Sequence, residues 1–199
     1  MSPPRTIWKI EAANSELRFT VSHLVISKVS GRFGRFWGTV HLDEEDVRRS
    51  TAELVIDAVS IDTGNAERDD HLRSPAFLDA RHHPAIRFRS TEIVPAGRGD
   101  YLVNGELTIR DLTQPVTVFV TDRGRVRDDR GKLKAAFYAH GGFNRQEFGM
   151  SWHNTMDSGA LIVGDEVEVH VDAEAFETPE VEEVGSPGEQ PARAGSGTP

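Results

Sequence analysis

Apolar and polar residues alternate without a break from Glu166 to Glu174. This period of two is typical of a β-strand with one buried face and one wet face. Residues 116–121 alternate less cleanly, with Val116, Val118 and Val120 on a shared face. Six further segments have the composition of strands: 16–21, 34–42, 53–57, 85–90, 102–109 and 134–140. The pattern therefore predicts a chain built mainly of antiparallel strands.

Turn-forming residues separate these segments. Residues 95–100 combine Pro, Gly and Asp, residues 128–131 combine Asp and Gly, and both predict tight connections between neighbouring strands. Gly105 indicates a bulge or bend within its strand. Helical periodicity is confined to residues 21–28 and 65–74, and in the second segment Asn65 is a suitable N-cap. A long meander must close or fold double to hide its edges, so the prediction is an all-β barrel or sandwich with short helical inserts.

Composition changes near the C-terminus. Residues 178–199 are rich in Pro, Gly, Ser and Glu and contain few apolar side chains. Such a segment cannot bury enough surface to offset the entropy of ordering it. The sequence therefore predicts a β domain over residues 1–177 and a disordered acidic tail over residues 178–199.

Overall composition narrows the classes of function. The chain has 199 residues and no cysteine, which excludes disulfides, thiolate catalysis and cysteine-bound metals. Its formal net charge of −9 argues against binding a nucleic-acid backbone. No apolar run is long enough for a transmembrane helix, and the first residues lack the apolar core of a signal peptide. The sequence thus predicts a cytoplasmic protein without a transmembrane segment.

One stretch concentrates residues capable of chemistry. Between positions 69 and 83 lie Asp69, Asp70, His71, Asp79, His82 and His83. Their spacing matches no established metal-ligand pattern, so a solvated loop is the favoured interpretation. A metal-assisted hydrolase that uses His71, His82 or His83 is the alternative function. The nearest approach to a serine-hydrolase elbow, at residues 149–153, lacks its second glycine.

Five stretches, in order along the chain, resemble the YceI-like family. They are residues 19–24 with 29–38; 60–63 with 68–74, 77–79, Pro84 and 86–88; 105–113 with 115–118; 144–150; and 163–169. The match runs from about Trp8 to Phe176. The resemblance implies a lipocalin-like, extended antiparallel barrel of about eight strands that holds an isoprenoid or a related amphiphile such as a quinone. It also implies export in many members, and barrels of this kind often pair as homodimers.

Candidate ligand contacts follow from the strand faces and from the resemblance. The apolar candidates for the cavity wall are Phe19, Val21, Phe36, Leu54, Ile56, Phe88, Leu107, Ile109, Phe119 and Phe137. The polar or amphipathic candidates for the mouth or inner lining are His23, Arg68, His71 and Trp152. A shift of register by one residue would turn any strand candidate outward. The leading hypothesis is a non-enzymatic lipid-binding protein without cofactor or metal; a barrel filled by its own side chains is another alternative.

Overall fold

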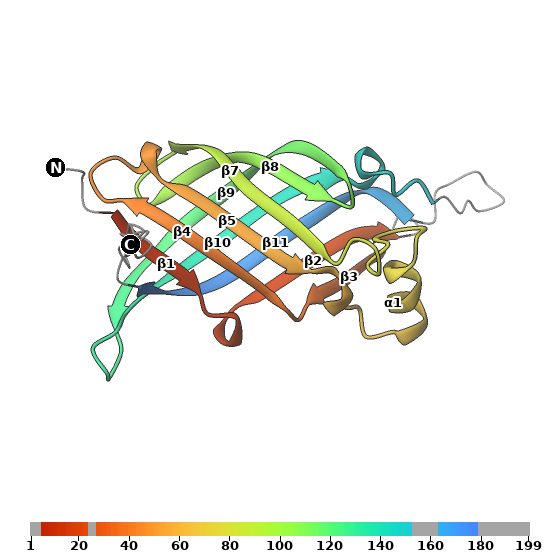
Figure 1. Ribbon diagram of the computed structural model, residues 1–199, viewed down its shortest axis with the longest axis horizontal. Coiled ribbons are helices and arrows are strands. Elements are labelled where there is room, and N and C mark those ends of the chain that lie inside the picture. Colours follow the sequence, from red (N-terminus) through yellow and green to blue (C-terminus); the bar gives the residue numbers. More distant parts are fainter. Residues whose placement is uncertain (1–4, 24–26, 153–162, 179–199) are drawn as a thin grey trace, which may run out of the picture.

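The computed structural model describes residues 5–23, 27–152 and 163–178, and its main feature is a β-barrel (Figure 1). The strands are β1 (Arg5–Ile10), β2 (Glu16–His23), β3 (Ser27–Phe33), β4 (Phe36–Asp43), β5 (Thr51–Asp57), β6 (Ile61–Asp62), β7 (Ala85–Pro95), β8 (Asp100–Ile109), β9 (Leu112–Arg127), β10 (Leu133–Asn144) and β11 (Val163–Thr178). The helices are α1 (Ala66–Arg73) and the short 3-10 turns η1 (Ala12–Asn14), η2 (Val47–Arg49), η3 (Ala58–Ser60) and η4 (Arg145–Phe148).

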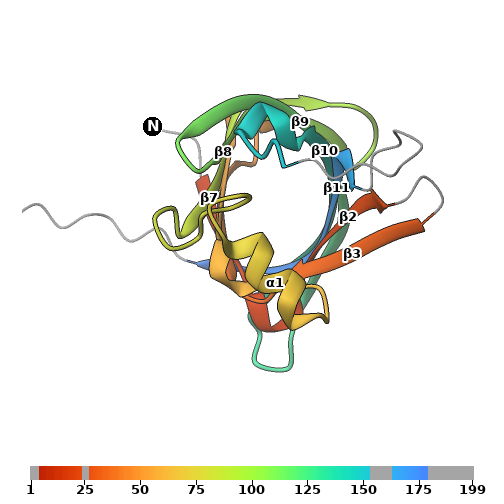
Figure 2. The same cartoon turned by 90° about the vertical axis from the view of Figure 1, so that its right-hand side faces the viewer.

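Eight antiparallel strands close the barrel in the order β1-β4-β5-β7-β8-β9-β10-β11, and β11 pairs with β1 to complete the ring. The long strand β11 pairs with β1 along its C-terminal half and with β2 along its N-terminal half. Strands β2, β3 and β6 therefore form a branch that leaves the ring at one end (Figure 2). This arrangement confirms the predicted all-β, lipocalin-like barrel of about eight strands with short helical inserts.

All eight predicted strand segments coincide with strands, except that residues 34–35 precede β4, but β1, β3 and β6 were not predicted. The prediction of helical structure at residues 21–28 is wrong where the structure describes it. Residues 21–23 end β2 and residues 27–28 begin β3, and Val21 pairs directly with Val29 across the two strands. Residues 24–26 lie outside the described residues. Cross-strand pairing has thus overridden a local apolar spacing that was too short to define a helix.

The bulge predicted at Gly105 lies in the neighbouring strand instead. Gly105 pairs with Ser90, and the register between β7 and β8 shifts at Thr91. A Cβ atom at Gly105 would lie 2.6 Å from the Phe88 ring and from the carbonyl oxygen of Arg89. Gly105 is therefore needed because the Phe88 ring packs directly on its backbone.

The second predicted helix is present as α1, and Asn65 caps it by accepting a hydrogen bond from the Arg68 N–H at 3.0 Å. α1 lies at one end of the barrel, beside the opening (Figure 2). We call this the α1 end; the β9–β10 hairpin projects from the opposite end, the hairpin end (Figure 1). No helix among the described residues is long and apolar enough to cross a membrane. Strand β11 runs to Thr178, one residue past the predicted domain boundary, and the rest of the predicted tail lies outside the described residues.

Candidate ligand-binding site

The barrel encloses a cavity of about 380 Å³. Inward-facing residues of the barrel strands form its wall, with Val, Leu, Ile and Phe predominating. On β11 the alternation detected in the sequence places Val167, Val169 and Val171 on the cavity wall. The charged residues in the lining are Glu53, Asp122, Arg125 and Arg145. A cavity with such walls favours an apolar occupant, because polar groups of a ligand would find few partners along its length.

Eight of the ten apolar candidates line this cavity: Phe19, Val21, Leu54, Ile56, Phe88, Leu107, Ile109 and Phe137. They come from β2, β5, β7, β8 and β10, so strands far apart in the sequence contribute to one wall. Residues that sequence reasoning did not propose include Val116, Val118 and Val120 on β9. The period of two that puts these three valines on one face was the sequence signal that could have identified them.

The other two apolar candidates lie elsewhere. Phe119 stands between Val118 and Val120, both of which face the cavity, so strand alternation turns it to the outer surface. There its ring packs on His140, with 5.3 Å between ring centroids. Phe36 pairs with Ile56 and is buried in the same hydrophobic core, but it is not part of the cavity lining.

None of the four polar or amphipathic candidates is among the described residues that line the cavity. His23 is the last residue of β2, and its side chain lies outside the described part. Arg68 donates from Nε to the Thr63 hydroxyl at 2.7 Å and from Nη2 to the Thr63 carbonyl at 3.0 Å. Its guanidinium therefore ties the start of α1 to the segment after β6, which is a structural role.

His71 and Trp152 form an aromatic layer at the α1 end, together with Phe77. The ring centroids of His71 lie 5.1 Å from those of both Phe77 and Trp152, and each pair meets edge to face. Phe77 and Trp152 are 5.6 Å apart. Of the three, only Phe77 touches the cavity, so His71 and Trp152 stand behind it as a second layer. Phe77 belongs to the hydrophobic core and Trp152 packs against it, so the cluster is anchored at the α1 end.

Arg145 is a lining residue that sequence reasoning missed, although it lies in one of the stretches that carry the family resemblance. Its side chain is buried, with 3% relative exposure. Nε donates to the Gly164 carbonyl, Nη1 to the carbonyls of Met150 and Trp152, and Nη2 to the Val163 carbonyl and the Asp165 carboxylate. These bonds use all five donors of a guanidinium. Arg145 therefore joins η4 to the start of β11 and has no donor left for a ligand.

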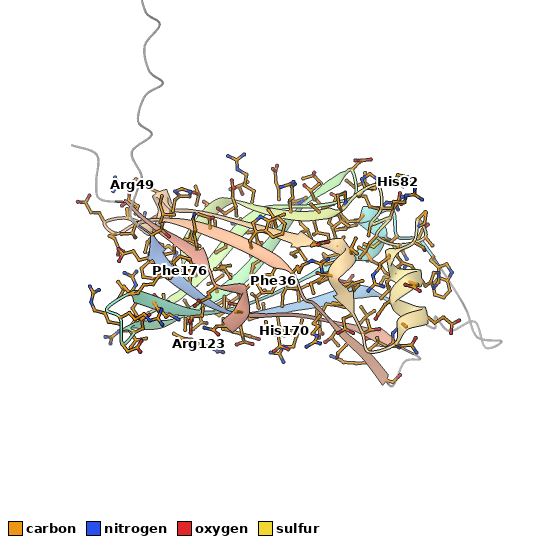
Figure 3. The ribbon with its side chains drawn as sticks, turned by 60° about the horizontal axis from the view of Figure 1, so that its bottom comes forward. Phe36, Arg49, His82, Arg123, His170 and Phe176 are labelled. Carbon is orange, nitrogen blue, oxygen red and sulfur yellow. The ribbon has the colours of Figure 1, made fainter. Side chains whose placement is uncertain are left out.

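The His/Asp-rich insert does not assemble a metal site within the described chain. No group of three or more His, Asp or Glu side chains is placed there to hold a metal ion. His82 bonds Asp79 at 2.8 Å and is exposed at the α1 end (Figure 3). His83 lies 3.3 Å from Asp111, and Asp69 accepts hydrogen bonds from the backbone and hydroxyl of Thr63. These contacts connect the insert to itself and to the barrel. His82 and His83 both lie beside Asp79, at 2.8 and 3.8 Å, but this grouping is not one that could hold a metal ion.

The hairpin end is built from charged pairs. Trp8 is buried there with 1% exposure, and the Arg125 guanidinium lies over its ring at 5.0 Å. Arg125 also pairs with Glu44 at 3.0 Å, and both side chains are about one third exposed. Nearby, hydrogen bonds from Lys134 and Asn14 lower the pKa of Glu174 to about 2. The same pairing raises the pKa of Lys134 above its usual value.

A closed antiparallel barrel of eight strands around an apolar cavity, with a helix beside one opening, defines a lipocalin-like barrel. The YceI-like domain family matches residues 8–175, and the chain belongs to this family. A UPF0312 protein of Shewanella denitrificans is 36% identical over 140 residues, which cover 70% of this chain and 73% of the relative. A UPF0312 protein of Vibrio cholerae is 31% identical over 162 residues, or 81% and 82% of the two chains.

Solved structures share the barrel. BcnA of Burkholderia cenocepacia superposes with a TM-score of 0.72 at 26% identity, over 83% of this chain and 98% of that one. A polyisoprenoid binding domain from Saccharophagus degradans superposes with a TM-score of 0.62, over 86% of this chain and 98% of that one. This domain is 14% identical in sequence to the chain, so the similarity shows the fold alone.

Proposed function

We propose that this protein is a non-enzymatic carrier that holds the apolar chain of an isoprenoid lipid, such as a polyprenyl compound or a quinone, inside the barrel. The apolar cavity of about 380 Å³ carries the proposal. Ligand pockets in proteins commonly occupy about 300–1,000 Å³. Burying a hydrocarbon chain contributes about 0.8 kcal/mol for each CH₂ group removed from water. The polyisoprenoid-binding description of the Saccharophagus degradans neighbour supports the choice of ligand class.

The polar groups of the lining point to an orientation for the ligand. Tyr101, Asp122 and Arg125 belong to the lining on the hairpin side of β8 and β9. Arg145, at the other end, has all its donors engaged by carbonyls and by Asp165. The head group is therefore expected toward the hairpin end, with the chain extending toward Phe77.

The test is native mass spectrometry of the purified protein together with extraction of bound lipid and titration with a fluorescent polyprenyl or quinone probe. Ala139→Phe places a ring in the cavity, because Ala139 is part of its lining. Ala136→Phe is the matched control, since Ala136 lies on the same strand and is exposed. We expect the first variant to lose probe binding and the second to retain it, with both folded by circular dichroism.

Recovery of no lipid, combined with no probe binding by the unmodified protein, would contradict the carrier function. Equal probe affinity for Ala139→Phe and the unmodified protein would contradict the cavity as the binding site. The cytoplasmic location and the homodimer stay predictions; fractionation of cells and sedimentation of the pure protein would test them.

A further inference from the structure

The β9–β10 hairpin carries an unusual charge for this chain. Residues 122–134 contain six basic and three acidic side chains, whereas the whole chain has a formal net charge of −9. The basic residues are Arg123, Arg125, Arg127, Arg130, Lys132 and Lys134. This hairpin projects past the barrel at the end opposite α1 (Figure 1), and Arg123 lies at its base (Figure 3). An acidic protein thus presents a basic protrusion at one end.

The three basic residues nearest the barrel are neutralised by the barrel itself. Arg123 pairs with Asp172 at 2.9 Å, Arg125 with Glu44 at 3.0 Å, and Lys134 with Glu11 and Glu174. These pairs hold the base of the hairpin to β11, to the segment after β4, and to the segment after β1. They leave the base of the hairpin without excess charge.

The three basic residues nearest the tip have no ion pair within the described part of the chain. Arg127, Arg130 and Lys132 are all exposed. The Asp128 carboxylate accepts backbone N–H bonds from Arg130 and Lys132 that form the turn. Together with Asp129 it leaves residues 126–132 with a formal net charge of +1. Lys132 instead lies over the Phe176 ring, with Nζ 3.4 Å from the ring centre. The tip therefore carries a small net positive charge on exposed basic side chains, in a chain whose formal net charge is −9.

An apolar side chain stands among these cations. Val126 is 65% exposed, which is the largest exposure among the described large hydrophobic residues that lie on the surface. It precedes Arg127 on β9. Basic side chains with an apolar neighbour are suited to an anionic bilayer, where cations meet phosphates and the apolar group enters the interface.

We propose that the tip of the β9–β10 hairpin (residues 126–132) docks the barrel on an anionic phospholipid bilayer. Arg127, Arg130 and Lys132 contact the lipid phosphates and Val126 enters the interface. Arg125 lies at the base of the same hairpin and lines the cavity, so docking brings the cavity's hairpin end to the lipid. The purpose of this docking rests on the proposed carrier function, whereas the contact with the bilayer requires only the hairpin.

The experiment is flotation of the full chain with vesicles of phosphatidylcholine alone or mixed with phosphatidylglycerol. We expect binding to the mixed vesicles only, and we expect it to disappear when salt rises from about 0.1 M to 1 M, because the Debye length falls to about 3 Å. Removing two charges with Arg127→Gln/Arg130→Gln should weaken binding by about 30-fold. Arg81→Gln/Arg87→Gln, which removes two exposed charges outside the hairpin, should leave binding unchanged.

Val126→Ser tests the apolar part, with Val59→Ser as its control because Val59 is 44% exposed on η3. Weaker binding by the first variant alone is expected. Equal binding to neutral and anionic vesicles, or equal loss in the hairpin and control pairs, would overturn the proposal. Ala139→Phe should still float with anionic vesicles. A protein that holds lipid but does not float contradicts the docking alone, and one that floats but never holds lipid contradicts the carrier function alone.

Discussion

Different interactions stabilise the two ends of the barrel. At the α1 end, a buried guanidinium, Arg145, bonds to four carbonyls and to Asp165, and the rings of His71, Phe77 and Trp152 pack on one another. At the hairpin end, Arg125 and Glu44 form a pair that is about one third exposed. Water and salt can replace an exposed pair at small cost, whereas buried donors and carbonyls have no such substitute. We therefore expect a ligand to leave through the hairpin end rather than through the α1 end.

The largest effect is expected from Arg145→Met. The variant keeps an unbranched side chain but leaves four carbonyls and the Asp165 carboxylate without their donor. Removing one partner of a buried charged network typically costs about 3–5 kcal/mol. We expect a loss of that size in the free energy of unfolding, measured by urea denaturation at pH 7.

Arg81→Met is the matched control, because Arg81 is exposed. Its free energy of unfolding should stay within about 0.5 kcal/mol of the unmodified protein. A cost below about 1 kcal/mol for Arg145→Met would show that the α1 end does not depend on this network, and the contrast between the two ends would lose its basis.

The barrel wall was predictable from sequence to a greater degree than its ends. The alternation that identified β11 puts Val167, Val169 and Val171 on one buried face, because pleating fixes the face of every second residue. The structure shows that this face is cavity wall, although the three valines were not among the candidates. The same rule explains the misplacement of Phe119, whose neighbours Val118 and Val120 face inward. Its size and apolarity suggested an inward position that the alternation forbids.

The end groups depend on contacts between distant segments, which no local pattern encodes. Arg145 reaches carbonyls on both sides of residues 153–162, and Arg125 meets Glu44 across 81 positions of sequence. Arg68 and His71 were recognised as residues of interest, but their partners Thr63, Phe77 and Trp152 decide their roles. In these cases the residues could be identified from the sequence, but their partners are determined by the fold.

We expect low pH to have an intermediate effect on the free energy of unfolding, through the ion pairs at the hairpin end. Hydrogen bonds from Lys134 and Asn14 lower the pKa of Glu174 to about 2, against an ordinary value of 4.5. A lowered folded-state pKa stabilises the fold above the unfolded pKa, and this contribution is lost as pH falls through the folded value. The free energy of unfolding should therefore decline between about pH 4.5 and pH 2.

Glu174→Gln should reduce stability at pH 7 and flatten that decline, as measured by urea denaturation at a series of pH values. Solvent screens this pair, so the loss at pH 7 should be smaller than that of Arg145→Met. Glu168→Gln is the control, because Glu168 lies on the same strand in an exposed pair with Lys28. If both variants flatten the decline equally, the acid sensitivity does not arise from the Lys134–Glu174 contact.

The smallest effect on stability, and the most direct test of which end opens, is expected from Glu44→Gln. The Arg125–Glu44 pair is about one third exposed on both sides, so its loss should cost less than about 1 kcal/mol in urea denaturation. The rate of transfer of a fluorescent polyprenyl probe from the protein to vesicles should nevertheless rise severalfold. The reason is that Arg125, which lines the cavity and lies over Trp8, loses the carboxylate that holds it there.

Trp152→Ala thins the aromatic layer at the other end and should leave this rate unchanged. Faster transfer in Trp152→Ala, without any change in Glu44→Gln, would assign ligand exit to the α1 end and reverse the roles of the two ends.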